Sequence, residues 1–264
     1  MRGIWPPTRL LAQDAVPATA VQATPVPPPG SPYWLFYDRV AAAQLAEWLP
    51  EQPARILDIS GGRRFAEQLA ADGHEVVHVM SRTVEPPAAP APGRLLPVVA
   101  DSRSLHWLQD GAVDLVLAES RALSMCLATE VTAEHLVRIL RPGGRLLLVV
   151  ESLLLGLARL AEQGRWAELA DAPSADVVLV PTSDGSILRC FWPEELHALL
   201  TMAGLDVEWV RPRTVLSPAT VERALDLGGT AALHTLVTTE LALTVDREGE
   251  STGLHLVASA RRPG

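Results

Sequence analysis

One stretch decides the fold of this chain: Arg55-Ile56-Leu57-Asp58-Ile59-Ser60-Gly61-Gly62-Arg63-Arg64. Its first half is a short apolar run, typical of a strand buried on both faces of a parallel sheet. Two glycines interrupt the run, and apolar residues then recur with helical spacing until Asp72-Gly73. A strand, a glycine turn and a helix start leave backbone N–H groups free for a nucleotide-like ligand. Two glycines also occur in βα units that bind nothing, so the turn alone does not decide the function.

Strands and helices alternate along the rest of the chain. The further strands are expected at 75–80, 95–100, 113–118, 145–150, 205–210 and 254–260. Helices are expected at 31–49, 104–110, 131–140 (stopped by Pro142-Gly143-Gly144), 193–202, from Ser217-Pro218 onward, and at 231–244. This alternation predicts an α/β, doubly wound, Rossmann-like fold with a mostly parallel sheet that helices cover on both faces.

Composition changes sharply near residue 31. Residues 1–31 are rich in proline and alanine, which predicts a disordered leader. Residues 32–264 are expected to form a single domain, with an inserted helix and hairpin at about 152–192.

Charge and composition exclude several classes of function. The net charge of −9 and pI near 5.3 argue against nucleic acid or an anionic membrane as the partner, since both attract basic surfaces. The chain has no lysine, so it cannot form a lysine Schiff base. Cys126 and Cys190 lie in apolar segments without metal-ligand spacing, which predicts buried free thiols in a cytoplasmic protein. The sequence does not indicate the oligomeric state.

The order of motifs over residues 33–262 resembles the class I S-adenosylmethionine-dependent methyltransferases. The run 134–146, with its Arg141-Pro142-Gly143-Gly144 turn, is similar to the family's helix, turn and fifth strand. Residues 110–118 resemble the fourth strand, and 191–205 resemble the late helix and sixth strand of members that act on small molecules. The resemblance implies a seven-stranded sheet whose last strand, 254–260, is antiparallel. It also implies S-adenosylmethionine as cofactor and a small-molecule methyl acceptor.

The same resemblance implies where the cofactor binds. The matching positions are Asp58, Ser60, Gly61 and Gly62 for the methionine part, Met80 and Ser81 for the ribose, and Asp101 and Ser102 for the adenine. Two departures stand out. The family loop has three alternating glycines where this chain has Ser60, Gly62 and Arg64. The family's ribose-binding acid is replaced by Met80, and the neutral Ser81 beside it makes a weaker bond than a carboxylate does.

A general base is needed only for some methyl acceptors, and the candidates follow strands four and five. Glu119 and Glu151 come at the carboxyl ends of these strands, where open α/β sheets bind ligands. Either glutamate also suits a structural role, as a helix cap or as the partner of Arg121.

The run His74-Glu75-Val76-Val77-His78 matches the HExxH zinc signature in letters only. That signature requires a helix, whereas this valine-rich run follows a glycine and predicts a strand. Residues four apart on a strand are roughly 13 Å apart, too far to share one metal ion. We therefore expect no metal site here.

Three functions follow from these patterns. The first is a methyltransferase for a small molecule. The second, prompted by the departures at Ser60, Arg64 and Met80, is a methyltransferase-like fold that has lost its cofactor and serves as a binding or regulatory protein. The third, a nicotinamide dehydrogenase, is disfavoured because the GxGxxG fingerprint is absent.

Overall fold

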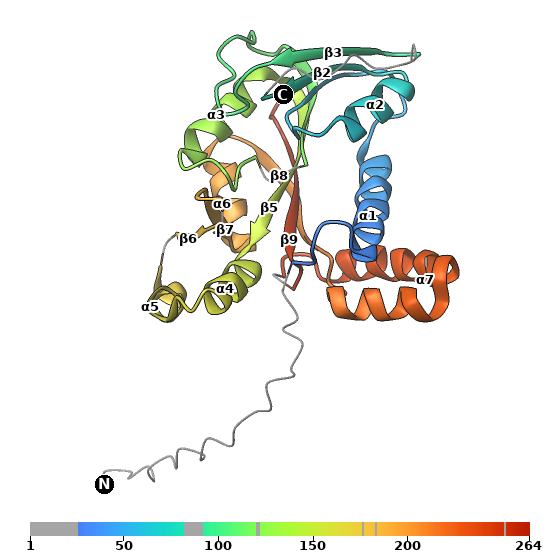
Figure 1. Ribbon diagram of the computed structural model, residues 1–264. Helices are drawn as coiled ribbons and strands as arrows, with labels where there is room; N and C mark the ends of the chain where they lie inside the picture. Colours follow the sequence, from blue (N-terminus) through green and yellow to red (C-terminus); the bar gives the residue numbers. More distant parts are fainter. Residues whose placement is uncertain (1–25, 82–91, 120–121, 176, 183, 251) are drawn as a thin grey trace, which may run out of the picture.

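The structure of the protein, a computed structural model, describes residues 26–81, 92–119, 122–175, 177–182, 184–250 and 252–264 (Figure 1). The helices are α1 (Pro32–Trp48), α2 (Arg63–Ala71), α3 (Thr129–Ile139), α4 (Leu153–Glu162), α5 (Trp166–Asp171), the 3-10 turn η1 (Ala172–Ser174), α6 (Pro193–Met202) and α7 (Pro218–Asp246). The strands are β1 (Arg55–Asp58), β2 (Glu75–Met80), β3 (Arg94–Val99), β4 (Val113–Ala118), β5 (Leu140–Ser152), β6 (Val178–Pro181), β7 (Ile187–Phe191), β8 (Asp206–Arg213) and β9 (His255–Arg261).

Serine and proline mark where several helices begin. Ser31 caps α1 with its side-chain oxygen, which accepts from the backbone N–H of Tyr33 at 3.1 Å, and a proline follows it. Ser217 caps α7 in the same way, again before a proline. Such caps satisfy N–H groups that have no partner inside the helix.

The central sheet is parallel in the order β3-β2-β1-β4-β5. Beyond β5, the antiparallel strand β9 pairs with both β5 and β8. This arrangement brings the carboxyl ends of β1, β2, β4 and β5 to one edge of the sheet. It also sets His255, the first residue of β9, directly opposite Glu151 near the end of β5.

An inserted hairpin raises the number of strands to nine. Strands β6 and β7 pair with each other, and β7 joins the sheet through the register pairs Glu151 with Cys190 and Ser152 with Phe191. Helices α4 and α5 pack on the hairpin around a small apolar core. The predicted α/β fold with an antiparallel last strand is confirmed, and two hairpin strands add to the seven of the core.

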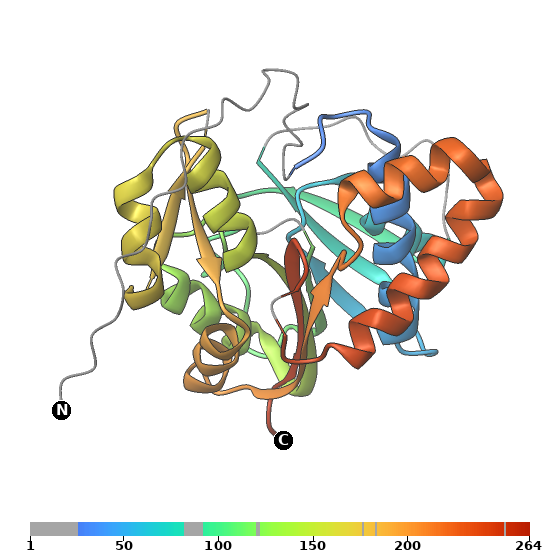
Figure 2. The same ribbon diagram turned by 90° about the horizontal axis from the view of Figure 1, so that it is seen from below.

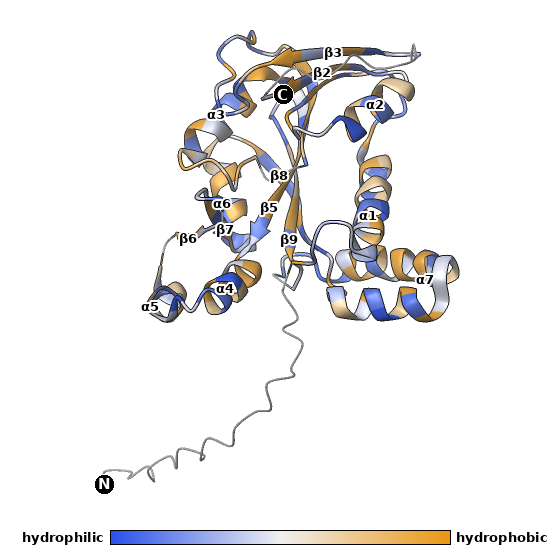
Figure 3. Cartoon of the chain, viewed as in Figure 1, coloured by the Kyte–Doolittle hydropathy of each residue, from blue (hydrophilic) through white to orange (hydrophobic). Residues whose placement is uncertain are grey.

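Helices cover both faces of the sheet (Figures 1 and 2). Helices α1 and α2 pack on one face around Ile56, Leu69 and Leu147, and α3 and α6 cover the other face. Helix α7 lies against α1 and changes direction at Gly229, where the backbone φ is 54°. Apolar colour is concentrated on the strands, whereas the helices carry both polar and apolar faces (Figure 3).

Most predicted elements are observed, but two details differ. The helix expected at 104–110 is wrong: these residues, all described, form turns. The carbonyl groups of Leu105 and Leu108 accept hydrogen bonds from the guanidinium of Arg138, each at 2.8 Å, which competes with helical pairing. Strand β5 also starts earlier than expected, at Leu140, and its pairing with β4 shifts register between Leu140 and Arg145.

Residues 1–25 lie outside the described residues, so the leader stays a prediction. Both cysteines are buried and free, as expected. Within the described ranges, no helix is both long and apolar enough to cross a lipid bilayer.

Candidate functional site

The glycine turn after β1 is built on two internal hydrogen bonds. The backbone N–H of Ser60 donates to Asp58 Oδ1 at 2.8 Å. The hydroxyl oxygen of Ser60 accepts from the backbone N–H of Glu119 at 3.0 Å, which ties the turn to the end of β4. Gly61 has φ of 74°, a conformation that favours glycine. Gly62 is the N-cap of α2, and a β-carbon there would meet no atom within 4 Å.

Asp58 lies beneath this turn rather than on its surface. Its side chain is fully buried, and Oδ2 lies 3.0 Å from Nδ1 of His78 on the neighbouring strand. The carboxylate therefore shapes the turn, and Asp58 is not among the residues that line the two hollows beside it.

A hollow of about 620 Å³ opens on one side of the turn. It is bounded by Gly61, by Met80 at the end of β2 and Ser81 directly after it, and by Asp101 and Ser102 after β3. The structure thus brings together the residues that the sequence assigned to the nucleoside. Met80 is 6 % exposed and forms part of the wall.

Asp101 is already engaged at the rim of this hollow. Arg103 donates to both of its carboxylate oxygens and also through its backbone N–H, at distances of 2.8 to 3.2 Å. The hydrogen bonds from the Arg103 guanidinium hold the pKa of Asp101 below its ordinary value. Asp101 is therefore ionised at neutral pH and able to accept a further donor.

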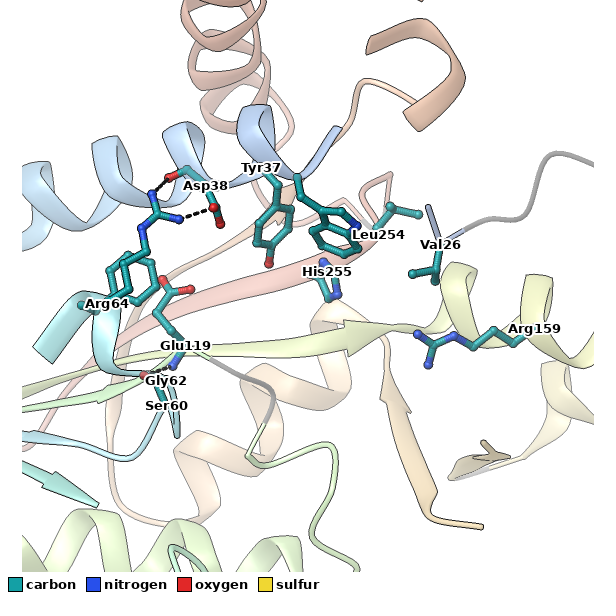
Figure 4. Close-up of a pocket in the computed structure, with 12 residues that line it drawn as sticks. Val26, Tyr37, Asp38, Ser60, Gly62, Arg64, Glu119, Arg159, Leu254 and His255 are labelled. Carbon is teal, nitrogen blue, oxygen red and sulfur yellow. Dashed lines mark hydrogen bonds and ion pairs between the residues drawn. The ribbon is translucent and has the colours of Figure 1, made fainter. Parts of the chain in front are cut away.

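A second hollow of about 240 Å³ opens on the other side of the turn (Figure 4). Its lining combines the turn with aromatic, apolar and cationic side chains from α1, α2, α4 and β9: Val26, Trp34, Tyr37, Asp38, Ser60, Gly62, Arg64, Phe65, Glu119, Arg159, Leu254 and His255. Arg64 points away from the turn and pairs with Asp38 of α1. This ion pair joins α1 to α2 across the hollow.

Glu119, one of the two predicted bases, is held by a buried arginine. Its two oxygens accept from Arg213 Nη1 at 2.6 Å and from Nη2 at 2.9 Å, and Gln44 accepts from Nε at 2.7 Å. Burial alone would lower the pKa of Arg213, but the facing carboxylate keeps that pKa above its ordinary value. Both oxygens of the Glu119 carboxylate are held by the two terminal nitrogens of one guanidinium, so this geometry favours a structural role for Glu119.

Glu151, the second predicted base, is fully buried at the end of β5. Its Oε1 lies 3.4 Å from Nη2 of Arg159, and its Oε2 lies 3.6 Å from Nε2 of His255. The His255 ring also meets the edge of Tyr37, with 5.4 Å between ring centroids. Glu151 is therefore placed behind His255, which itself lines the hollow.

Sequence reasoning missed His255, Arg159 and Arg213. The pairing of the last strand with the fifth would have found His255, because register sets it opposite Glu151. Tyr37 of α1 also lines the smaller hollow. Burial raises the pKa of its phenol, which keeps the hydroxyl protonated.

Residues 75–78 of the HExxH match lie on strand β2, as predicted, and His74 directly precedes the strand. His74 Nδ1 accepts from the backbone N–H of Ala54 at 3.1 Å, and His78 pairs with Asp58. The described residues contain no group of three or more His, Cys, Asp or Glu placed to hold a metal ion.

Comparison with known proteins supports the fold. No protein-family model and no curated protein matches the chain. A Methanosarcina mazei S-adenosylmethionine-dependent methyltransferase aligns with TM-score 0.54 and 18 % identity over 83 % of this chain and 97 % of its own. A Burkholderia thailandensis 1,6-didemethyltoxoflavin N1-methyltransferase, solved with bound 1,6-didemethyltoxoflavin and S-adenosylhomocysteine, aligns with TM-score 0.53 and 18 % identity over 88 % of this chain and 82 % of its own. A Mesorhizobium loti S-adenosylmethionine-dependent methyltransferase aligns with TM-score 0.54 and 18 % identity over 84 % of this chain and 98 % of its own.

The chain therefore has the fold of the class I S-adenosylmethionine-dependent methyltransferases. The strand order and the antiparallel β9 agree with the resemblance read from the sequence. At this level of identity the similarity defines the fold, and the activity is argued below from the site.

Proposed function

We propose that the protein transfers a methyl group from S-adenosylmethionine to a small-molecule acceptor. One observation carries the proposal: a single glycine turn forms the wall between two hollows, at the carboxyl ends of the strands. Methyl transfer needs a donor and an acceptor held in line on either side of the transferred carbon. The two hollows supply those two places.

The residues around the larger hollow fit the cofactor in shape. Gly61 and Gly62 permit close approach, and neither Arg64 nor Met80 fills the turn. Ser81 would meet the ribose, and Asp101 and Ser102 the adenine. Met80 replaces a carboxylate that would accept two charge-assisted bonds, so we expect affinity about 10- to 100-fold weaker than with that acid in place.

Bound S-adenosylmethionine supplies a methyl group activated by its positive sulfur. We assign the methyl acceptor to the smaller hollow, called the acceptor hollow below. The chain positions the acceptor and shields it from water, because α1 lies over this hollow and the ion pair between Arg64 and Asp38 joins α1 to α2. For an acceptor that must lose a proton, we assign the base to His255, with Glu151 behind it to stabilise the imidazolium. We assign Glu119 to the structure of the site, through Arg213.

Calorimetry tests cofactor binding directly. We expect S-adenosylmethionine and S-adenosylhomocysteine to bind the full chain, in the larger hollow beside Gly61, Met80 and Ser81. Absence of heat at millimolar ligand would contradict the proposal.

The chemical step is tested separately with His255→Gln. This variant should keep cofactor affinity while losing methyl transfer to the acceptor, measured as release of S-adenosylhomocysteine. Equal loss of binding and turnover would show that His255 has only a structural role.

A second candidate function is a fold that has lost its cofactor, and Met80 is the observation that favours it. Met80→Asp discriminates between the two. If the native site binds the cofactor weakly, we expect the variant to gain about 10- to 100-fold in affinity. If the fold has lost the cofactor, neither protein will bind, although thermal unfolding shows both to be folded.

A further inference from the structure

The arginines buried in this molecule differ in how completely their donors are used. In Arg213, whose side chain is 0 % exposed, all three guanidinium nitrogens donate to described partners. The same is true of Arg189, whose side chain is 9 % exposed and donates to Glu130 and Glu195. These two arginines are satisfied within the protein.

Arg159 differs from both. Its side chain is 15 % exposed, and its Nη1 is buried without a hydrogen-bond partner among the residues that the structure describes. Its contact with Glu151, at 3.4 Å from Nη2, is longer than the 2.7–2.9 Å typical of a charge-assisted hydrogen bond. A buried donor without a partner is costly, and its presence points to a ligand group that completes it.

The position of Arg159 in the acceptor hollow indicates what that group joins. Figure 4 shows the lining running from Ser60 and Gly62, past Tyr37 and His255, to Arg159 at the far end. The middle of the hollow is aromatic and apolar, which suits a flat ring. The acids at the other end do not repel an anion, because Glu119 is paired with Arg213 and Asp38 with Arg64.

We propose that the acceptor is an aromatic carboxylate, whose anionic group is held by Arg159 and whose ring lies beside Tyr37 and His255. The carboxylate anchors the molecule, and the methylated atom lies at the opposite end of the ring, toward the glycine turn. This inference rests on the proposed function, since it names the substrate class of the same site. Binding of the anion, however, requires no cofactor.

The test compares 4-hydroxybenzoate with 4-hydroxybenzamide, two phenols that differ in charge at one end. Binding to the full chain is measured by calorimetry without S-adenosylmethionine. We expect the carboxylate to bind at least tenfold more tightly than the amide. Arg159→Gln should remove this preference, and Arg159→Lys should retain part of it, because the charge remains. Arg165→Gln, which changes an exposed arginine paired with Glu168 just beyond α4, should leave the preference unchanged.

Three results would overturn the inference: equal affinities for the two phenols, no binding of either at millimolar concentration, or a preference that survives Arg159→Gln. Thermal unfolding of each variant establishes that it is folded, and Arg159→Lys gives a second reading if the glutamine variant is not. If 4-hydroxybenzoate is preferred over 4-hydroxybenzamide but S-adenosylmethionine does not bind, the proposed methyl transfer is wrong, whereas the inferred anion site at Arg159 is retained.

Discussion

The ion pair between Arg213 and Glu119 joins the end of β8 to the end of β4, and its removal is a strong test of the site. We consider Glu119→Gln, Arg213→Met and the double variant. Arg213 is completely buried and Glu119 nearly so, and two hydrogen bonds of 2.6 and 2.9 Å connect them. Each single change leaves the other charge buried without its counter-charge.

The expected cost follows from that burial. Removing one partner of a buried ion pair typically destabilises a protein by about 3–5 kcal/mol. Glu119→Gln keeps an oxygen acceptor for one of the two nitrogens, so we expect about 3 kcal/mol for it and up to about 5 kcal/mol for Arg213→Met. The double variant should be less destabilised than the sum, with a coupling energy of about 2–3 kcal/mol.

Urea unfolding followed by circular dichroism measures these free energies. A matched control is Glu75→Gln, because Glu75 pairs with Arg55 at a similar distance, 3.1 Å, on the exposed surface. That change should cost less than about 1 kcal/mol. The reasoning is refuted if the destabilisations of the two single variants add up to that of the double variant, or if each is as small as that of Glu75→Gln. Glu119 would then again be a candidate base.

Three further predictions concern other parts of the fold. Gly61→Ala should destabilise the protein by about 1–2 kcal/mol, because its φ of 74° is unfavourable for a residue with a β-carbon; Gly62→Ala should change stability by less than about 1 kcal/mol, and thermal unfolding of both checks the contrast. Glu240→Gln should cost about 1.5–3 kcal/mol in urea unfolding, since the buried carboxylate accepts from the backbone N–H groups of Val215 and Leu216 at 2.8 and 3.0 Å, and a cost near zero would contradict these bonds. Burial raises the pKa of Cys190 from 9.0 to about 12, so its thiolate fraction at pH 8 falls about a thousandfold. Mass spectrometry should therefore find no alkylation of Cys190 by iodoacetamide in the native protein and rapid alkylation in urea. Alkylation of Cys190 in the native protein would show that this thiol is accessible.

The strands were predictable because their apolar runs are short, continuous and bounded by turn residues. Strands β2 and β4 have the expected bounds to the residue. The failure at 104–110 has a specific cause: Arg138, about thirty residues away, binds the carbonyl groups that a helix would use. Local spacing carries no signal of such a distant partner.

The site was predictable where chain order alone brings residues together. The turn, Met80, Ser81 and Asp101 all lie at or just beyond the carboxyl ends of parallel strands, so topology alone brings them to one edge of the sheet. The roles of the two glutamates were not predictable, because they depend on the register of β8 and β9, which sets Arg213 and His255 at this edge. Register between antiparallel strands distant in sequence leaves no spacing pattern to read.

The inserted segment from α4 to β7 affects how the sequence of this protein can vary without disturbing the sheet. Its strand β7 meets the main sheet through only two residue pairs, while α4 carries Arg159 into the acceptor hollow. We therefore expect substitutions between residues 153 and 191 to change the lining of the smaller hollow near Arg159 while the glycine turn and the parallel strands keep their alignment. Under the proposed function, a change of methyl acceptor would therefore require no rebuilding of the sheet.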